Sequence, residues 1–259
     1  MPLTRHILFW VLGGISRLTR NLPWLKKDAV ICRVGNQAKF KIRANTSDRL
    51  IISEVWELRE YNDSSDLAIK PDYSVVVIGA QIGVYSVLAA KKAYKGKVYS
   101  YEPYPESFDL LKQNVALNRL KNVQLFNMAV SDTTGKKILY VSLSNTGAHS
   151  LFPDPGKRKV EVKTTTLDKV ISENKLGEID LLKIDVEGSE YEIILKAPDK
   201  TLKRIRRIIM EYHDHIVSGM KHTMIMERLK RVGFEVKDKG YFMQRELLKT
   251  GFIEAVNRT

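Results

Sequence analysis

The strongest constraint on the fold is an alternation of short apolar runs with helical segments from Tyr73 onward. The first run, 74–78, is almost continuously apolar, as expected for a parallel strand that is buried on both faces. Further strands are predicted at 98–101, 123–126, 179–184 and 205–211, and helices at 85–94, 105–118, 167–173 and 189–196. Repeated β-α-β units predict a doubly wound α/β sheet that binds ligands beyond the carboxyl ends of its strands.

The rest of the chain divides into an extension over residues 1–66 and additions to the α/β domain, which spans residues 67–259. In the extension we expect a lead helix over 1–27, a hairpin over 29–43 and a helix over 49–61. Within the domain, 136–164 is predicted to form a hairpin-like insertion, and the helix at 167 follows a capping-box-like Thr165-x-x-Asp168. A helix over 219–232 and two strands near 234–238 and 251–256 complete it.

The lead segment carries a short apolar run, residues 7–12, between cationic residues. Because a spanning helix needs about 20 apolar residues, this run is too short to cross a membrane. It lacks a small-residue cleavage site, so we do not expect a removable signal peptide. Trp10, Trp24 and the cations suit a peripheral helix on a membrane surface, but a helix packed on the domain is the favoured interpretation.

Composition bounds the compartment and the partners. Cys32 is the only cysteine, which excludes an internal disulfide and a cysteine-based zinc site and suits a reducing, cytoplasmic compartment. The 43 Lys and Arg residues exceed the 30 acidic ones, for a formal net charge of +13. Such a surface attracts phosphates, acidic glycans, anionic lipids or nucleic acid. Nucleic acid is the less favoured partner because no recognition module accompanies the charge.

A glycine-containing turn connects the first strand to the next helix. Gly79 and Gly83 allow a sharp bend and a close approach to a ligand, and the helix N-terminus is expected to offer unsatisfied N–H donors. Glu102 ends the second strand, where a carboxylate can accept hydrogen bonds from ribose hydroxyls. A tight turn and a solvated strand end would explain these residues separately; together they favour an adenosine-containing ligand. The spacing is not GxGxxG, which disfavours NAD.

Four segments resemble the FkbM-type methyltransferase family: 76–86 (VVIGAQIGVYS), 101–118 (YEPYPESFDLLKQNVALN), 165–168 (TTLD) and 182–190 (LKIDVEGSE). The resemblance covers roughly residues 45–215, and the KIDVEGSE stretch is its most specific part. It implies a Rossmann-like class I methyltransferase fold, with a mostly parallel seven-stranded sheet and an antiparallel C-terminal strand, and O-methylation by S-adenosylmethionine. The cofactor-binding residues that it implies are Gly79, Ala80, Gln81, Gly83, Tyr85 and Ser86 for the methionine part, Glu102 for the ribose, and Asn127 and Met128 for the adenine.

Two positions depart from the family's pattern. The family usually has an aspartate two residues before the first glycine, where this chain has Val77, and usually has asparagine where this chain has Gln81. Losing the aspartate removes a charge-assisted hydrogen bond, which contributes about 1.5–3 kcal/mol. A catalytically silent relative that acts as a surface protein is therefore one alternative function.

The candidate catalytic residues follow the fourth and fifth strands, at the ligand edge. Asp185 or Glu187 could orient or deprotonate an acceptor hydroxyl, and His213 could act as a general base. Alternatively, Glu187 complements the next helix dipole, Asp185 orders the turn and His213 is structural. Asp185, Glu211 and His213 could in principle hold a divalent ion, but the ligand set is too loose to predict a metal site.

The sequence therefore predicts an enzyme that methylates a hydroxyl on a small molecule or glycan. Methylation of RNA is the second hypothesis, motivated by the net charge. Base-amine methylation usually needs a D/N-P-P-[YFW] turn after strand four, and this chain has Asp185-Val186-Glu187-Gly188 there. The acceptor pocket should form from the extension, the insertion with His149 and Ser150, and the loop after strand five, none of which specifies a substrate.

Overall fold

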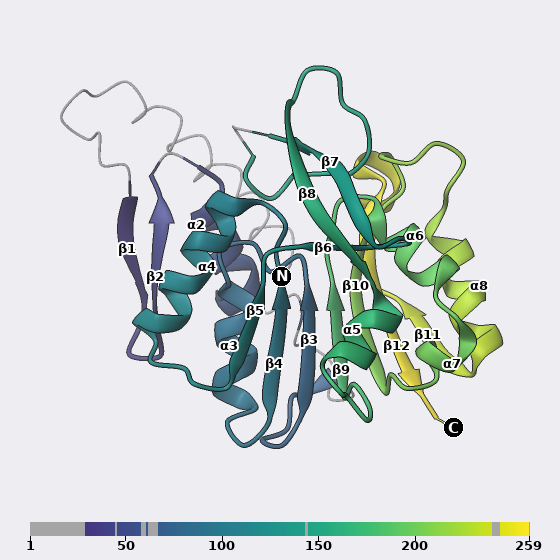
Figure 1. Cartoon of the computed structure of the whole chain (residues 1–259), viewed down its shortest axis with the longest axis horizontal. Helices are drawn as coiled ribbons and strands as arrows, with labels where there is room; N and C mark the ends of the chain where they lie inside the picture. Colours follow the sequence, from purple (N-terminus) through teal and green to yellow (C-terminus); the bar gives the residue numbers. More distant parts are fainter. Residues whose placement is uncertain are drawn as a thin grey trace.

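The computed structural model describes residues 29–44, 46–57, 61, 67–142, 145–239 and 244–258, so the predicted lead helix over 1–27 lies outside the described residues. Its centre is a seven-stranded sheet in the order β11-β12-β10-β9-β3-β4-β5 (Figure 1). The strands are β3 (Ser74–Ile78), β4 (Lys97–Tyr101), β5 (Val123–Phe126), β9 (Leu181–Ile184), β10 (Arg207–His213), β11 (Phe234–Asp238) and β12 (Thr250–Asn257). Only β12 runs antiparallel to its neighbours β10 and β11. The predicted sheet is confirmed.

Helices cover both faces of the sheet, which explains why its central strands are apolar throughout. Val75 and Val77 of β3 pack with α3 (Val84–Lys92) and α4 (Pro105–Leu117) on one face. Val76 and Ile78 pack on the other face, with α5 (Leu167–Glu173), α6 (Ser189–Lys196) and α8 (His222–Val232). Both faces of β3 are thus removed from water, as its composition predicts.

The described part of the extension packs against α4 and the α3 side of the sheet. β1 (Ala29–Val34) and β2 (Ala38–Arg43) form the predicted hairpin, and α2 (Asp48–Ile52) continues into a π-helical turn, η3 (Ser53–Glu57). Asn114 of α4 accepts a hydrogen bond from the Lys41 N–H at 2.6 Å and donates to its carbonyl at 3.0 Å. The side chain of Asn114 therefore substitutes for a neighbouring strand along the edge of β2.

The insertion forms a separate three-stranded sheet in the order β6-β8-β7. β7 (Gly135–Val141) and β8 (Arg158–Thr166) are the predicted hairpin, whereas β6 (Ala129–Ser131) and the short α7 (Asp199–Leu202) were not predicted. The capping prediction was wrong by one residue. Thr165 belongs to β8, and Thr166 caps α5 by accepting the Lys169 N–H at 3.3 Å.

Two element boundaries matter for the site. β10 extends to His213, which is therefore the last residue of the strand. The sequence had predicted that the strand ends at residue 211 and that His213 lies in the loop after it. The strand reaches this far because β12 pairs with it along its whole length, ending with His213 opposite Thr250. α8 begins at His222, later than the predicted 219, because Gly219 has a φ of +79°. Among the described residues, no helix is both long and apolar enough to span a membrane.

Candidate active site

The turn between β3 and α3 is the segment predicted to bind the cofactor. Gly79, Gln81 and Gly83 have positive φ angles of +78°, +50° and +89°. A Cβ atom at Gly79 would lie 1.7 Å from the main-chain carbonyl oxygen of Asp185, so only glycine fits there. Gly79 thus allows the turn after β3 to lie directly against the turn after β9.

The N–H groups of this turn, which precedes α3, are bonded within the protein. The expectation of unsatisfied donors concerns the first N–H groups of α3, which begins at Val84. All five, from residue 79 to residue 83, have an acceptor between 2.8 and 3.1 Å away. The acceptors are the Tyr101 carbonyl for Gly79 and Ala80, the Glu102 carboxylate for Gln81, the Gln81 side chain for Ile82, and the Ala80 carbonyl for Gly83. The conformation of the turn is therefore fixed by hydrogen bonds to residues at the end of β4 and to the side chain of Gln81 within the turn.

Glu102 lies immediately after β4 and is only 5% exposed. One carboxylate oxygen accepts the Gln81 N–H and the other accepts the Tyr104 N–H, both at 2.8 Å. Burial raises the pKa of Glu102 to about 7, although these two hydrogen bonds and the charges of Arg43 and Lys183 oppose the rise. A carboxylate held at this edge next to the glycine turn fits the ribose of an adenosine ligand.

The other predicted cofactor residues occupy different environments. Ser86 is fully buried and accepts a hydrogen bond from the Ser100 hydroxyl at 2.8 Å, whereas Tyr85 is buried against the ring of Tyr61. Asn127 is exposed, and its amide donates to the carbonyls of residues 102 and 103, while Met128 is half-buried. Asn127 therefore helps to fix the segment that carries Glu102.

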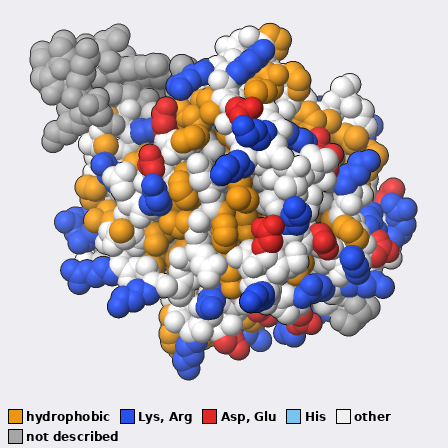
Figure 2. Space-filling model, in the orientation of Figure 1, with side chains coloured by type: hydrophobic (Ala, Val, Ile, Leu, Met, Phe, Trp, Pro, Cys, Tyr) orange, Lys and Arg blue, Asp and Glu red, His pale blue; other side chains and the backbone are white. Residues whose placement is uncertain are grey.

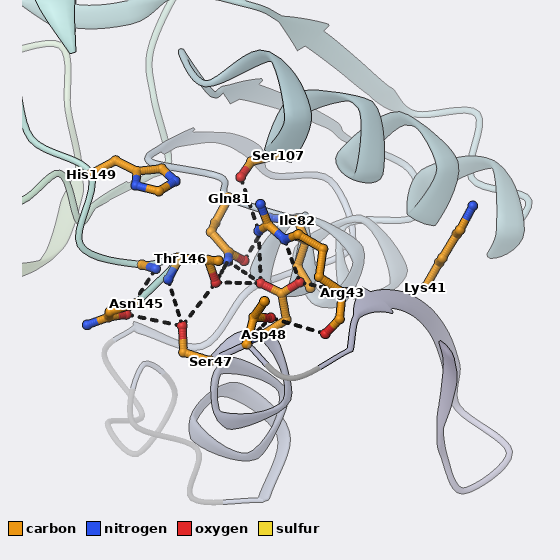
Figure 3. A network of polar contacts seen from close by, with 12 residues as sticks. Lys41, Arg43, Ser47, Asp48, Gln81, Ile82, Ser107, Asn145, Thr146 and His149 are labelled. Atoms are coloured by element: carbon orange, nitrogen blue, oxygen red, sulfur yellow. Dashed lines mark hydrogen bonds and ion pairs between the residues drawn. The ribbon is translucent and has the colours of Figure 1, made fainter. Parts of the chain in front are cut away.

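A polar network around Asp48 joins the extension, the insertion and the glycine turn (Figure 3). Asp48 is fully buried and forms a paired contact with the Arg43 guanidinium, with both distances at 2.9 Å. Asp48 Oδ1 also accepts hydrogen bonds from Thr146 at 2.6 Å and from the Gln81 amide at 2.9 Å. The longer side chain of Gln81 thus bonds to Asp48 while its oxygen holds the Ile82 N–H.

The predicted catalytic residues lie together at the carboxyl ends of β9 and β10. His213 is 4% exposed; its Nδ1 lies 3.2 Å from Glu190 Oε1, and its Nε2 faces Glu187 Oε2 at 3.7 Å and Glu211 Oε1 at 3.9 Å. Asp185 and Glu211 both accept from the Tyr61 hydroxyl, at 3.2 and 3.3 Å. The acid–histidine cluster is the name used below for His213 and these four acids, Asp185, Glu187, Glu190 and Glu211.

Mutual charge sets the protonation of this cluster. Burial and the neighbouring Asp185 raise the pKa of Glu211 well above its ordinary value, although the charge of His213 opposes this. Burial also raises the pKa of Glu187, to about 7, again against the charge of His213. Burial would lower the pKa of His213, but Glu187 and Glu190 outweigh it, so that this pKa is raised. The neighbouring carboxylates therefore favour the charged form of the His213 imidazole.

Lys183 and Tyr61 support the cluster and were not predicted. The Lys183 ammonium lies 2.9 Å from Asp185 Oδ2 and 5.0 Å from the centre of the Tyr61 ring. Burial opposes ionisation of Asp185, but the charges of Lys183 and His213 and the hydrogen bonds from Lys183 and Tyr61 together outweigh it and lower the pKa of Asp185. Lys183 pairs in register with Val77, which occupies the family's usual aspartate position. A lysine inside an otherwise apolar strand was the available sequence signal.

The insertion reaches the same turn. Ser150 donates a hydrogen bond from its hydroxyl to the Glu187 carbonyl at 2.6 Å. His149 packs edge-on against Tyr104, and its Nδ1 accepts the Ser142 N–H at 3.2 Å. Glu187 has a φ of +51°, and the following Gly188 has a φ of +102°. Ser150 therefore helps to hold the strained backbone on which Glu187 is carried.

Comparison with known families adds the decisive observation. A family model for the methyltransferase FkbM domain matches residues 78–236, which include the glycine turn, Glu102 and the acid–histidine cluster. The chain belongs to the FkbM methyltransferase family. Like its family, it is an S-adenosylmethionine-dependent methyltransferase. The resemblance seen in the sequence is therefore confirmed.

Over the aligned regions, curated relatives are about a quarter identical to this chain. The 31-O-demethyl-FK506 methyltransferase FkbM of Streptomyces tacrolimicus is 27% identical, with 73% of this chain and 80% of that protein covered. The hexuronic acid methyltransferase AglP of Haloferax volcanii is 24% identical, with 69% and 72% covered. The AMB antimetabolite synthetase AmbE of Pseudomonas aeruginosa is 26% identical over 66% of this chain, which spans only 10% of that protein's length.

A solved structure supports the fold. The Methanococcus jannaschii fibrillarin pre-rRNA processing protein superposes with a TM-score of 0.50 over 90% of this chain and 84% of that chain, at 16% identity. This likeness concerns the fold alone.

Proposed function

We propose that this methyltransferase acts on a hydroxyl oxygen of a small molecule or sugar. The observation that carries the proposal is the position of the acid–histidine cluster. The turn that holds Asp185 and Glu187 touches the glycine turn at Gly79, so groups able to orient and deprotonate a hydroxyl lie beside the turn that the family uses for its cofactor. Two relatives named for acting on 31-O-demethyl-FK506 and on hexuronic acid support this class of acceptor.

The cofactor contacts form the first part of the proposal. S-adenosylmethionine would supply the methyl group from its sulfonium sulfur, and the resulting neutral thioether would be the leaving group. We assign the ribose to Glu102 and the methionine part to the turn from Gly79 to Gly83, with Tyr85 and Ser86 supporting that turn from below. Asn127 and Met128, at the end of β5, are assigned to the adenine side. The closeness of Glu102 to Gln81 supports this grouping.

The acceptor contacts form the second part. Glu187 is the proposed general base, because its carboxylate has a pKa of about 7 and its side chain is 18% exposed, enough to be reached. His213, which is buried with its Nε2 3.7 Å from Glu187 Oε2, positions Glu187, and Asp185 orients the acceptor hydroxyl. General-base catalysis by a positioned carboxylate contributes typically about 10²–10⁴-fold in rate. These three residues together leave no need for a separate base from the insertion.

A labelled-cofactor assay tests the proposal. The pure protein is incubated with methyl-labelled S-adenosylmethionine and a panel of hydroxylated acceptors, including neutral sugars, hexuronic acids and macrolides. We expect label in an ether, which survives mild base, and not in a methyl ester, which does not. Glu187→Gln should lower kcat about 10²-fold or more without weakening cofactor binding. Glu173→Gln, on an exposed position of α5, is the matched control.

Two results would contradict the proposal: base-labile label throughout the panel, or full kcat in Glu187→Gln. RNA remains the second candidate acceptor, favoured only by the net charge of +13. An RNA arm of the same assay decides between them, because incorporation into RNA with no transfer to the panel would replace the first proposal by the second.

A further inference from the structure

At the carboxyl ends of the paired strands β9 and β10, three side chains turn atoms that could bind a metal ion toward one another without forming hydrogen bonds between them. One ligand atom each from Asp185, Glu211 and His213 lies within 4.8 Å of the others. His213 Nε2 has its nearest carboxylate oxygens at 3.7 and 3.9 Å, beyond hydrogen-bond length, and no described residue bonds to it. A buried imidazole nitrogen thus points into a group of carboxylates with nothing bonded to it.

The outer atoms of these three residues are held by other groups. The Nδ1 atom of His213 is held by Glu190, which fixes the ring so that Nε2 faces inward. Lys183 and Tyr61 hold Oδ2 of Asp185, and Tyr61 also holds Oε2 of Glu211. Within the described residues, the second oxygens of both carboxylates make no hydrogen bond. Outer partners that fix each ligand are the arrangement typical of metal sites.

The surroundings of the three residues are rich in carboxyl groups. The side chains of Asp185, Glu187, Glu190 and Glu211 surround two basic side chains, Lys183 and His213. All of these groups are partly or fully buried, and a divalent ion would lie where the carboxyl groups converge.

We propose that Asp185, Glu211 and His213 bind a divalent first-row cation such as Mn²⁺. Two carboxylate oxygens and one imidazole nitrogen form a mixed donor set that suits such ions. Three ligand atoms spaced evenly at 2.0–2.2 Å from one ion lie at most about 3.8 Å apart, so atoms that now lie within 4.8 Å of one another would approach by up to about 1 Å through side-chain rotation. The ion would keep further positions open for acceptor oxygens, a role that rests on the proposed function, whereas its binding does not.

Cation binding is tested first without cofactor or acceptor. The full chain is treated with a chelator and titrated with Mn²⁺, and free Mn²⁺ is followed by its electron paramagnetic resonance signal. We expect about one bound equivalent, at least tenfold weaker binding in Glu211→Gln and in Asp185→Asn, and unchanged binding in Glu173→Gln. Circular dichroism establishes that each variant is folded.

Control variants separate this site from other acidic groups. Asp132 and Glu192 share the Lys137 ammonium near β6 and form a second acidic group that includes no residue of the acid–histidine cluster. If Glu192→Gln weakens Mn²⁺ binding and Glu211→Gln does not, the proposed site is wrong. Absence of binding at millimolar Mn²⁺ also overturns it. Either result leaves O-methylation intact, while bound Mn²⁺ without any ether product would contradict the proposed function alone.

Discussion

Glu102 determines how the cofactor edge responds to pH. Its pKa of about 7 reflects burial, so the carboxyl is partly protonated at neutral pH. Because this folded-state pKa lies above the ordinary value of 4.5, Glu102 favours the folded state most below pH 4.5, and that contribution is lost as the pH rises through 7. A ribose hydroxyl that donates to Glu102 requires the ionised form and therefore has the opposite preference.

We therefore expect adenosine ligands to bind more tightly as the pH rises. Between pH 6 and pH 8, the Kd of 5′-methylthioadenosine, which keeps the ribose and lacks the amino-acid tail, should fall about tenfold. Glu102→Gln should weaken binding roughly ten- to a hundredfold at pH 8 and remove the pH dependence. Isothermal titration calorimetry measures both. A variant that retains the wild-type pH profile would show that Glu102 does not hold the ribose.

Gly79 and Gly35 need to be glycine for different reasons, Gly79 because another main-chain segment lies against it and Gly35 because of its backbone conformation alone. Both have positive φ angles, but a Cβ at Gly35 meets no atom within 4 Å, whereas a Cβ at Gly79 meets the Asp185 carbonyl. Gly35→Ala should cost about 1–2 kcal/mol of unfolding free energy from the backbone conformation alone. Gly79→Ala should cost about 4 kcal/mol or more, because two main-chain segments must separate. Urea unfolding compares the two, and equal losses would refute the close approach.

At the scale of elements, the β1–β2 hairpin and the insertion are fastened to the glycine turn by Asp48. Burial opposes ionisation of Asp48, yet the hydrogen bond and charge of Arg43 outweigh it and lower its pKa below the ordinary 3.8. The stabilisation from a lowered pKa is present above pH 3.8 and is lost as the pH falls through the folded-state value. Attachment of the hairpin should therefore fail on acidification.

The Asp48→Asn substitution tests this attachment. It leaves Arg43, whose side chain is 18% exposed, without its charged partner, and we expect a loss of about 2–4 kcal/mol at pH 7. The difference from wild type should narrow as the pH falls from 5 to 3. Glu161→Gln, which removes an exposed ion pair with Lys136, should change stability by less than about 1 kcal/mol. Thermal unfolding across this pH range gives the comparison; a constant difference would exclude the proposed linkage.

Periodicity explains which elements were predictable. The seven strands of the main sheet and the helices α3, α4, α5, α6 and α8 were predicted because apolar runs and glycine turns are local signals, and the KIDVEGSE stretch located the acidic turn. Three-residue β6 and four-residue α7 are too short to show a period. The bonds from Asp48 to Thr146 and Gln81 connect residues 98 and 33 positions apart, and no local pattern specifies such pairings.

The site residues show the same division. The sequence placed Asp185, Glu187 and His213 at one sheet edge, because parallel strands end together there. It could not show that Glu190 orients the imidazole of His213. Nor could it show that Tyr61, from the extension, bonds to both Asp185 and Glu211. Those contacts depend on how side chains from separate elements meet in space.

At the scale of the whole molecule, the positive charge is spread over the surface. Figure 2 shows Lys and Arg side chains distributed around the visible face and interspersed with acidic ones, without a continuous stripe. A diffuse charge of +13 favours weak, non-specific attraction to polyanions. The peripheral membrane contact through residues 1–27, the less favoured interpretation of that segment, concerns residues outside the described ones and stays a hypothesis.

We expect RNA to bind weakly and without being methylated. The Kd for a single-stranded RNA should rise steeply between 50 and 200 mM salt, as expected for counterion release, with no label transferred from the cofactor. Fluorescence anisotropy measures binding, and a sulfated or uronic polysaccharide of similar charge serves as the control. Sequence-dependent, salt-resistant RNA binding would contradict this expectation.

The closeness of Gly79 to Asp185 has a consequence for changing this enzyme's specificity. Because the main chain at Gly79 contacts the main chain at Asp185, no side chain can be introduced between these two turns, and one cannot be moved without the other. New acceptors would have to be accommodated by altering the β1–β2 hairpin and the insertion, which border the two turns. A graft of those peripheral parts from a relative should therefore transfer substrate choice while the catalytic chemistry stays in place.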